Sequence, residues 1–395
     1  MGLPCSANNI SFHSVPLTLK IEKLVAGGQG IARHEGRVVF IGGVLPGEEV
    51  LVELVEEKKD FAKAELSEIL QPSPDRVAPP CSLAGICGGC DWLHIDSKAQ
   101  ARLKVEIVHD ALRRIGGITW PELKIETGSP LGYRNRLQLH TNHAGEVGFL
   151  ERHGHVLVPV KNCPVANPRF APLFEKRTAP HAPERFHAFA CKKPDGTQGL
   201  WREDEQPHAE IKVKIQDREF VFPVNGFFQS NLEMVERLVP YVIHGLNGDT
   251  VMDLYSGVGL FGSFLKSHFR HVICVESNRE ALNFARRNLA TDAASFVVGQ
   301  VEQLVEQSDA SLLWEQPDAI VVDPPREGLD VKVRAWLKKQ ETPKLIYVSC
   351  NPVTLARDLK DLLAGPYALE DLRLFDFYPQ TSHIEAVAKL RIKNV

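Results

Sequence analysis

Residues 253–262 have the sequence Asp253-Leu254-Tyr255-Ser256-Gly257-Val258-Gly259-Leu260-Phe261-Gly262. The apolar residues just before this glycine-rich stretch predict a buried strand that ends in a tight turn. Glycines at such a turn let the backbone approach a ligand closely. An acidic residue, Glu276, ends the next apolar segment and is placed to hold ribose hydroxyls. The stretch therefore predicts a nucleotide-like cofactor at the end of a strand.

The chain around this turn alternates between strand-like and helix-like segments from residue 226 onward. Apolar segments that predict strands lie at residues 250–254, 272–275, 295–298, 319–322 and 345–348. This alternation favours an α/β fold with a mostly parallel, doubly wound sheet covered by helices on both faces. Ligands of such sheets bind at the carboxyl ends of the strands. Residues that directly follow the strands are therefore the candidates for a functional site.

The glycine turn is compatible with two cofactors. It satisfies the dinucleotide fingerprint, so an NAD-dependent oxidoreductase is one alternative. Two features favour S-adenosylmethionine instead. Asp253 precedes the first glycine, where a carboxylate would repel a pyrophosphate and tolerate the charged amino acid end of a methyl donor. The rigid segment Asp323-Pro324-Pro325-Arg326 follows the fourth expected strand, at the edge where ligands bind.

A thiol follows the fifth expected strand, in Ser349-Cys350-Asn351-Pro352. A methyl donor is an electrophile, so a nucleophilic cysteine beside it needs a target on the acceptor. The C5 carbon of a pyrimidine becomes nucleophilic when a thiolate adds at C6, and a general base must then remove the C5 proton. Glu385 is the candidate base. His383 is the alternative, because it lies two residues away and on the same face of an expected C-terminal strand.

Four of the eight cysteines form a ligand-like pattern. Cys81, Cys87 and Cys90 are spaced C-x5-C-x2-C, and the distant Cys163 is followed by a proline. This pattern suits a four-thiolate iron–sulfur cluster. A structural zinc site is the alternative, because zinc also accepts four cysteines. The other three cysteines outside the expected active site are interpreted as structural: Cys5, Cys191 and Cys274.

The rest of the chain predicts further domains. Residues 15–70 alternate apolar and polar positions between glycine-rich turns, which predicts a small all-β barrel. A proline-rich linker follows at residues 71–75. An amphipathic helix is expected near residues 97–115 and a hairpin at residues 135–160. Residues 164–216 have only weak periodicity, and their sequence predicts no role for that segment.

Length and charge set the broad limits. The 395 residues are enough for two to three domains. The formal charge of −4 gives no overall basic surface, so any contact with nucleic acid must come from local clusters such as Arg134-Asn135-Arg136. No apolar run approaches the length of a membrane span, and no secretory signal is evident. We therefore expect a cytoplasmic protein.

Five motifs occur in the order found in the RNA uridine C5 methyltransferases, which make 5-methyluridine in ribosomal and transfer RNA. They are Phe227-Phe228-Gln229-Ser230-Asn231, the turn at residues 253–259, Asp323-Pro324-Pro325-Arg326, Ser349-Cys350-Asn351-Pro352 and His383-Ile384-Glu385. The chain resembles this family over nearly its whole length. Its N-terminal barrel resembles a TRAM domain, an OB-like module of RNA modification. The resemblance implies a Rossmann-like class I methyltransferase domain that uses S-adenosylmethionine.

The resemblance also implies roles for individual residues. Cys350 would be the nucleophile, Glu385 the base, and Phe227 would stack on RNA near the target. Members that act on ribosomal RNA carry a [4Fe-4S] cluster on a cysteine spacing like the one in this chain. Contacts to S-adenosylmethionine are expected from four residues: Gln229, Tyr255, Glu276 and Asp323.

We therefore expect three parts: a TRAM-like β-barrel RNA-binding domain at residues 1–72, a small α+β domain with the iron–sulfur cysteines at 73–222, and the catalytic domain at 223–395. The expected activity is C5 methylation of one uridine in 23S ribosomal RNA, by a monomer, with uridine 54 of tRNA as the alternative target. An NAD-dependent oxidoreductase would leave the barrel unexplained. A non-catalytic, redox-sensing RNA-binding protein would leave Cys350 and Glu385 unexplained.

Overall fold

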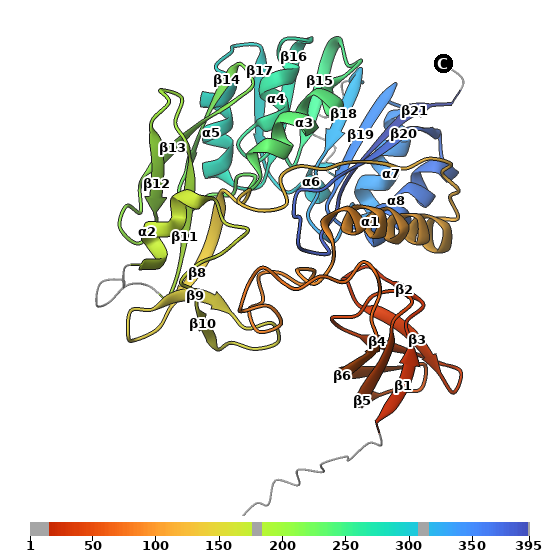
Figure 1. Ribbon diagram of the computed structural model, residues 1–395. Coiled ribbons are helices and arrows are strands. Elements are labelled where there is room, and N and C mark those ends of the chain that lie inside the picture. Colours follow the sequence, from red (N-terminus) through yellow and green to blue (C-terminus); the bar gives the residue numbers. More distant parts are fainter. Residues whose placement is uncertain (1–15, 176–183, 307–315, 394–395) are drawn as a thin grey trace, which may run out of the picture. The chain divides into compact units, whose positions relative to one another are not determined.

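The computed structural model describes residues 16–175, 184–306 and 316–393. The chain divides into two compact units, Met1–Val77 and Ala78–Val395 (Figure 1). The sequence-based boundary inside the second unit, between residues 222 and 223, stays a prediction. Cys5 lies outside the described residues.

The first unit is a six-stranded sheet. Its strands are β1 (Leu17–Lys20), β2 (Lys23–Leu24), β3 (Gly30–His34), β4 (Arg37–Ile41), β5 (Glu49–Glu57) and β6 (Phe61–Gln71). They pair in the order β1-β5-β6-β4-β3-β2. This order begins with β1 and ends with β2, so the predicted small β-domain is present as an open sheet. Alternating apolar residues of these strands, among them Ile41, Val50 and Val52, form its core.

The segment expected to be a linker after β6 is held by the first unit. Glu48 is completely buried and accepts hydrogen bonds from the backbone amides of Leu45 and Ser73. The Arg76 guanidinium donates two further bonds, at 2.6 and 2.7 Å, to the same carboxylate. Although burial opposes ionisation, these partners lower the pKa of Glu48. The ion pair therefore fastens residues 73–76 to the turn before β5.

The second unit is built on an eight-stranded sheet in the order β17-β16-β15-β18-β19-β21-β20-β7. The expected strands are present as β15 (Gly248–Leu254), β16 (Phe269–Glu276), β17 (Ala294–Val298), β18 (Ala319–Val322) and β19 (Lys344–Ser349). These five are parallel. Three further strands complete the sheet: β20 (Tyr367–Phe375), β21 (Glu385–Ile392) and β7 (Lys124–Glu126).

Strand β21 distinguishes this sheet from a dinucleotide-binding one. It runs antiparallel to both β19 and β20, whereas the dinucleotide fold continues with parallel strands. Strand β7 adds to the far edge beside β20, although it lies more than 200 residues earlier in the chain. The strand order thus brings the start of β21 next to the end of β19, where the fifth parallel strand delivers its terminal residues.

Helices cover both faces of this sheet (Figure 1). They are α3 (Leu232–Ile243), α4 (Leu260–Leu265), α5 (Arg279–Leu289), α6 (Val301–Leu304), α7 (Val331–Gln340) and α8 (Pro352–Ala364). Several begin at a residue whose side chain accepts a hydrogen bond from the first turn, including Asn231, Asn278 and Asn351. These caps start the helices directly after the loops that carry the motifs.

The remaining elements surround residues 97–223. Helix α1 (Ser97–Ala111) starts behind the Asp96 cap and continues into a π-helical turn, Leu112–Gly116. A five-stranded sheet has the order β10-β9-β8-β11-β12, and β13 with β14 forms a separate hairpin. The strands are β8 (Arg136–Thr141), β9 (Val147–Leu150), β10 (Leu157–Pro159), β11 (Arg185–Lys192), β12 (Gln198–Arg202), β13 (Glu210–Ile215) and β14 (Arg218–Pro223). The short helical turns are η2 (Pro168–Phe170) and α2 (Ala171–Glu175).

The segment to which the sequence assigned no role is largely framework. Buried residues of β13 and β14 belong to the same apolar core as helices α3 to α5, and so does the buried Cys191 of β11. Cys274 of β16 is also buried there. No helix in the described ranges is both long and apolar enough to cross a membrane.

Candidate active site

A cavity of about 850 Å³ opens at the carboxyl edge of the parallel strands. Its size falls within the range of small-molecule sites. The turn after β15, the end of β16, the segment after β17 and the prolines after β18 line one part of it. Cys350, Tyr378 and residues 383–385 line another. The cavity therefore joins a donor side, built on the glycine turn, to an acceptor side, built on the thiol and the start of β21.

Backbone geometry shapes the glycine turn. Gly259 has a φ of +80°, and a Cβ atom at this position would lie 2.7 Å from Leu289. Only glycine fits such a backbone packed this closely. Asp253 does not line the cavity. It is completely buried and accepts a 2.8 Å hydrogen bond from the Gly262 amide, so it braces the turn. The expectation that Asp253 faces the donor's charged end is therefore not met, and burial raises the pKa of Asp253 to about 7.

All four residues expected to contact the donor line the cavity: Gln229, Tyr255, Glu276 and Asp323. Glu276 is the most firmly fixed of them. Its carboxylate accepts hydrogen bonds from the Gly257 amide at 3.0 Å and from the Asn278 amide at 2.7 Å. One side chain thus ties the glycine turn to the start of α5. The role of these residues as donor contacts stays a prediction.

Glu302 is a cavity residue that the sequence analysis missed. It lies at the start of α6 and accepts a 2.6 Å hydrogen bond from the Tyr255 hydroxyl. Burial and this carboxylate raise the pKa of Tyr255, so the phenol stays a donor. The Gly299-Gln300 pair, directly after the third parallel strand, was the sequence signal for a further site loop.

The acceptor side brings Cys350 and Glu385 together. Ser349 pairs with Ala386 in the antiparallel register of β19 and β21. One step further in that register, Cys350 lies opposite Glu385, where side chains of neighbouring strands are in reach of one another. Burial, then Glu385 and Asp323, raise the pKa of the Cys350 thiol to about 11, whereas Arg326 acts to lower it. The resting thiol is therefore protonated at neutral pH.

The carboxyl groups near the thiol are also perturbed. Burial raises the pKa of Asp323 to about 7. Burial and the charge of Asp323 raise the pKa of Glu385 well above its usual range, against the pull of Arg326. Two buried carboxyls that repel one another are typical of a site whose protonation depends on what is bound.

His383 reaches the cavity from a loop and not from a strand, because β21 begins at Glu385. The expectation of two residues on one strand face is therefore wrong, although both side chains line the cavity. A guanidinium nitrogen of Arg326 lies 3.5 Å from the His383 ring nitrogens, and the Tyr378 ring packs edge-on against the imidazole. Burial, followed by Arg326, lowers the pKa of His383, so the imidazole is neutral at pH 7.

Phe227 stands at the mouth of the cavity with 67 % of its surface exposed. The Arg136 guanidinium lies 6.0 Å from the centre of its ring. An exposed aromatic face beside a cation suits stacking on a nucleic-acid base. Arg136 belongs to the basic cluster that the sequence singled out, and its position connects that cluster to the cavity.

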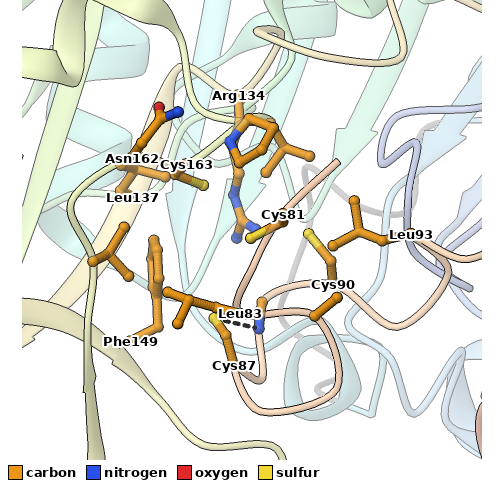
Figure 2. A pocket seen from close by; sticks show the side chains of 15 residues that line it. Cys81, Leu83, Cys87, Cys90, Leu93, Arg134, Leu137, Phe149, Asn162 and Cys163 are labelled. Atoms are coloured by element: carbon orange, nitrogen blue, oxygen red, sulfur yellow. Dashed lines mark hydrogen bonds between the residues drawn. The ribbon is translucent and has the colours of Figure 1, made fainter. Parts of the chain in front are cut away.

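The four cysteines of the ligand-like pattern line a second cavity, together with Arg134 and apolar residues such as Leu83, Leu137 and Phe149 (Figure 2). Figure 2 shows the Arg134 guanidinium among the sulfur atoms. Burial raises the pKa of the Cys90 thiol to about 12, with further contributions from Cys163 and Cys87, while Arg134 opposes the rise. Within the described ranges, no three His, Cys, Asp or Glu side chains are arranged to hold one metal ion.

Comparisons with known proteins agree with this geometry. A family model for tRNA (uracil-5-)-methyltransferase matches residues 203–393, and a TRAM domain model matches residues 17–67. An uncharacterized RNA methyltransferase of Treponema denticola is 31% identical, over 94% of this chain and 98% of its own length. An uncharacterized RNA methyltransferase of Bdellovibrio bacteriovorus is 32% identical, over 95% of each chain.

A solved structure covers both units. The tRNA (uracil-54, C5)-methyltransferase of Pyrococcus abyssi, determined in complex with S-adenosyl-L-homocysteine, is 26% identical. It matches 95% of this chain and 100% of its own, with a TM-score of 0.74. The NAD-dependent oxidoreductase and the non-catalytic RNA-binding protein are both set aside by these matches. The chain belongs to the tRNA (uracil-5-)-methyltransferase family of S-adenosylmethionine-dependent RNA uracil methyltransferases, with a TRAM domain at its N-terminal end.

Proposed function

We propose that this enzyme methylates C5 of one uridine in RNA through a covalent bond between Cys350 and C6 of the uracil. The observation that carries the proposal is the shared cavity, in which the Cys350 thiol and the Glu385 carboxyl lie beside a glycine turn suited to a methyl donor. S-adenosylmethionine supplies an electrophilic methyl group. Uracil C5 is too weak a nucleophile to take it without activation, which is the task of the thiol.

The steps follow from the groups present. The Cys350 thiol loses its proton and the thiolate adds to C6, which moves electron density onto C5. The activated C5 forms a bond to the methyl carbon as the bond from that carbon to the sulfonium sulfur breaks, which releases S-adenosyl-L-homocysteine and leaves C5 with both a methyl and a hydrogen. A base removes that hydrogen as a proton, and the electron pair left on C5 expels the thiolate from C6. The product is 5-methyluridine and free enzyme.

Charge supports this sequence of steps. In the absence of ligands, burial disfavours the ionised forms of the Cys350 thiol and of Glu385 and raises the pKa of both groups. A methyl donor carries a positive sulfonium, and a cation beside Asp323 lowers the cost of ionising the neighbouring groups. Binding of the donor is therefore expected to prepare the acceptor side for addition and proton removal.

We assign the base to Glu385, because the strand register places it opposite the thiol. His383 is the second candidate, because burial and Arg326 lower the pKa of its ring and leave it free to accept a proton. The two differ in what their loss leaves behind. The residue that removes the C5 proton is the one whose replacement traps methylated RNA on Cys350, which a denaturing gel shows as a slow band.

The test of the whole proposal is the Cys350→Ala variant. It should bind S-adenosylmethionine as the wild type does, form no covalent RNA complex and lose methyl transfer by a factor on the order of 10⁴ or more, as nucleophile replacements do in other enzymes. Incorporation of a labelled methyl group into RNA measures the loss, and calorimetry measures donor binding. Retained methyl transfer would exclude the covalent mechanism.

We propose 23S ribosomal RNA as the substrate, on the grounds of the four-cysteine pattern. The second candidate is uridine 54 of tRNA, which is favoured by the similarity to the Pyrococcus abyssi enzyme. In either RNA the uridine must leave its stack to reach the cavity. Mapping of 5-methyluridine in both RNAs from a deletion strain, with and without the restored gene, distinguishes the two targets.

We also propose that Cys81, Cys87, Cys90 and Cys163 hold a [4Fe-4S] cluster. The support for this proposal is that the four thiols of the C-x5-C-x2-C and distant-cysteine pattern line one cavity, and such a pattern suits four thiolate ligands. The cationic Arg134 among them complements thiolates. Anaerobically purified protein should be brown, with about four irons per chain. Colourless protein with one tightly bound zinc would contradict the cluster.

A further inference from the structure

The loop between β20 and β21, residues 376–384, forms much of the acceptor side. It carries Tyr378 and His383 into the cavity and delivers Glu385 at the start of β21. One of its residues, Gln380, has a φ of +68°, in the left-handed region that residues other than glycine rarely adopt. Such a backbone persists only where its surroundings hold it.

Residues that hold this loop come from a segment almost 300 positions earlier in the chain. The Gln380 amide donates to the Gln100 side-chain oxygen at 2.8 Å, and the Gln100 side-chain nitrogen donates to the Gln380 side chain at 2.9 Å. The Gln380 carbonyl accepts from the Trp92 amide at 3.0 Å. The Ser382 amide donates to Asp91 Oδ1 at 2.9 Å. The amide, the carbonyl and the side-chain oxygen of the strained residue are therefore all bonded to this early segment.

A buried ion pair also holds the loop at residues 376–384 in place. Lys104 of α1 is completely buried and donates to Asp376 Oδ1 at 2.6 Å and to the Tyr378 carbonyl at 3.1 Å. Its ammonium also lies 5.7 Å from the centre of the Trp92 ring. A buried pair of this kind adds little net stability, and its use is to fix one arrangement over others. We call Asp91, Trp92, Gln100 and Lys104 the clamp.

The clamp starts at the cysteine cavity. Asp91 directly follows Cys90, which lines that cavity, and its side chain holds the Ser382 amide next to His383. A displacement of Cys90 is therefore passed to the acceptor side through one peptide bond and one hydrogen bond. The hydrogen bonds described above for the glycine turn and for Glu276 of the donor side involve no residue of the clamp.

We propose that Asp91 is a positioning residue through which the four-cysteine site sets the acceptor side of the active site and not the donor side. This inference rests on the proposed function, because it assigns the loop to the methylation step. Geometric errors of about 1 Å in an active site can cost 10²-fold in rate. Loss of the Asp91 hydrogen bond should thus act on turnover far more than on donor binding.

The experiment compares Asp91→Ala with Asp91→Asn and with Glu106→Ala. Asparagine keeps the oxygen that accepts from Ser382, and Glu106 lies on the exposed side of α1, where it pairs with Arg102. Asp91→Ala should lower kcat for RNA methylation roughly 10- to 100-fold with donor affinity within about twofold of wild type. Asp91→Asn should recover most of that loss, and Glu106→Ala should equal wild type. Unchanged kcat in Asp91→Ala would overturn the proposal.

Hydrogen exchange provides a readout that does not depend on activity. Amides of residues 377–384 should exchange faster in Asp91→Ala and in Cys90→Ser, while those of β15 and β16 keep the wild-type rate. Unchanged exchange in the loop of Cys90→Ser would overturn the link to the cysteine site. A wild-type enzyme that makes no 5-methyluridine would contradict the proposed function, whereas an active enzyme that tolerates Asp91→Ala contradicts this inference alone.

Discussion

The donor side and the acceptor side of the cavity are built in different ways. The donor side uses backbone: a glycine turn with left-handed residues, and a carboxylate, Glu276, held by two amides. The acceptor side uses buried side chains whose ionised forms burial disfavours: Cys350 and Glu385, both with raised pKa values. In the proposed mechanism, the donor side recognises the cofactor by its shape, and the acceptor side supplies the groups that gain and lose protons.

This difference has a practical consequence. The donor side is held by backbone amides that donate to the carboxylates of Glu276 and Asp253. The acceptor side depends on burial, on Arg326 and on a loop that other parts of the chain hold in place. Changes on the acceptor side should therefore alter the chemical step, and changes on the donor side should alter affinity.

The largest expected effect separates the two sides through Glu385. Glu385→Gln should lower turnover by roughly 10²- to 10⁴-fold, the usual contribution of a general base. Thiolate addition and methyl transfer should still occur, so methylated RNA accumulates on Cys350 as a slow band in a denaturing gel. Donor affinity should stay at the wild-type value. Free turnover in Glu385→Gln, with the band in His383→Ala instead, would move the base to His383.

A substitution on the donor side should weaken donor affinity and leave the rate at saturating donor nearly unchanged. Glu276→Ala removes the acceptor for the Gly257 and Asn278 amides, and about 1–3 kcal/mol for unpaired groups corresponds to a roughly 10- to 100-fold weaker donor affinity. Calorimetry with S-adenosyl-L-homocysteine, which occupies the donor position, measures this affinity. Methyl transfer at saturating donor should change far less. Asp292→Ala, exposed after α5, is the matched control. A large loss of rate at saturating donor would mean that the two sides are not separable.

A pH series should sharpen the contrast. The pKa of the Cys350 thiol, raised to about 11, lies above the working range, so each unit by which the pH rises within that range gives about ten times more thiolate. Single-turnover formation of the RNA adduct should therefore rise about tenfold per unit from pH 7.5 to 9. Donor affinity should change little, because Asp323, with a pKa of about 7, is mostly ionised there. A rate that is flat with pH would indicate a thiol already ionised in the complex.

The smallest effect is expected from the first unit. Deletion of residues 1–77 should weaken RNA binding severalfold and flatten its salt dependence, because cationic contacts with phosphates release counterions. Neither side of the cavity should change, so the rate on saturating RNA and the donor affinity should persist. Binding measured at several salt concentrations tests this. An unchanged affinity and salt slope would assign the TRAM domain some other task.

Much of the donor side could be predicted from the sequence because it is local. The strand, the turn and the helix that follow one another at residues 248–265 are set by neighbouring residues, through apolar periodicity and the freedom of glycine. The parallel strands were predicted for the same reason. The small all-β N-terminal domain was also predicted from local alternation, but the order and openness of its sheet were not, because they depend on which distant strands pair.

The acceptor side shows the limit of that reasoning. Cys350 and Glu385 were found from the chemistry of uracil and from family motifs, but the strand register that brings them together depends on an antiparallel strand inserted beside β19. No pattern in the sequence predicted the clamp, because its hydrogen bonds join residues 272 to 291 positions apart. Periodicity and turn chemistry act between near neighbours along the chain. A side chain is buried, and its pKa is raised, only when distant segments pack around it and exclude water. The hydrogen bonds that hold the strained loop also form only when these segments pack.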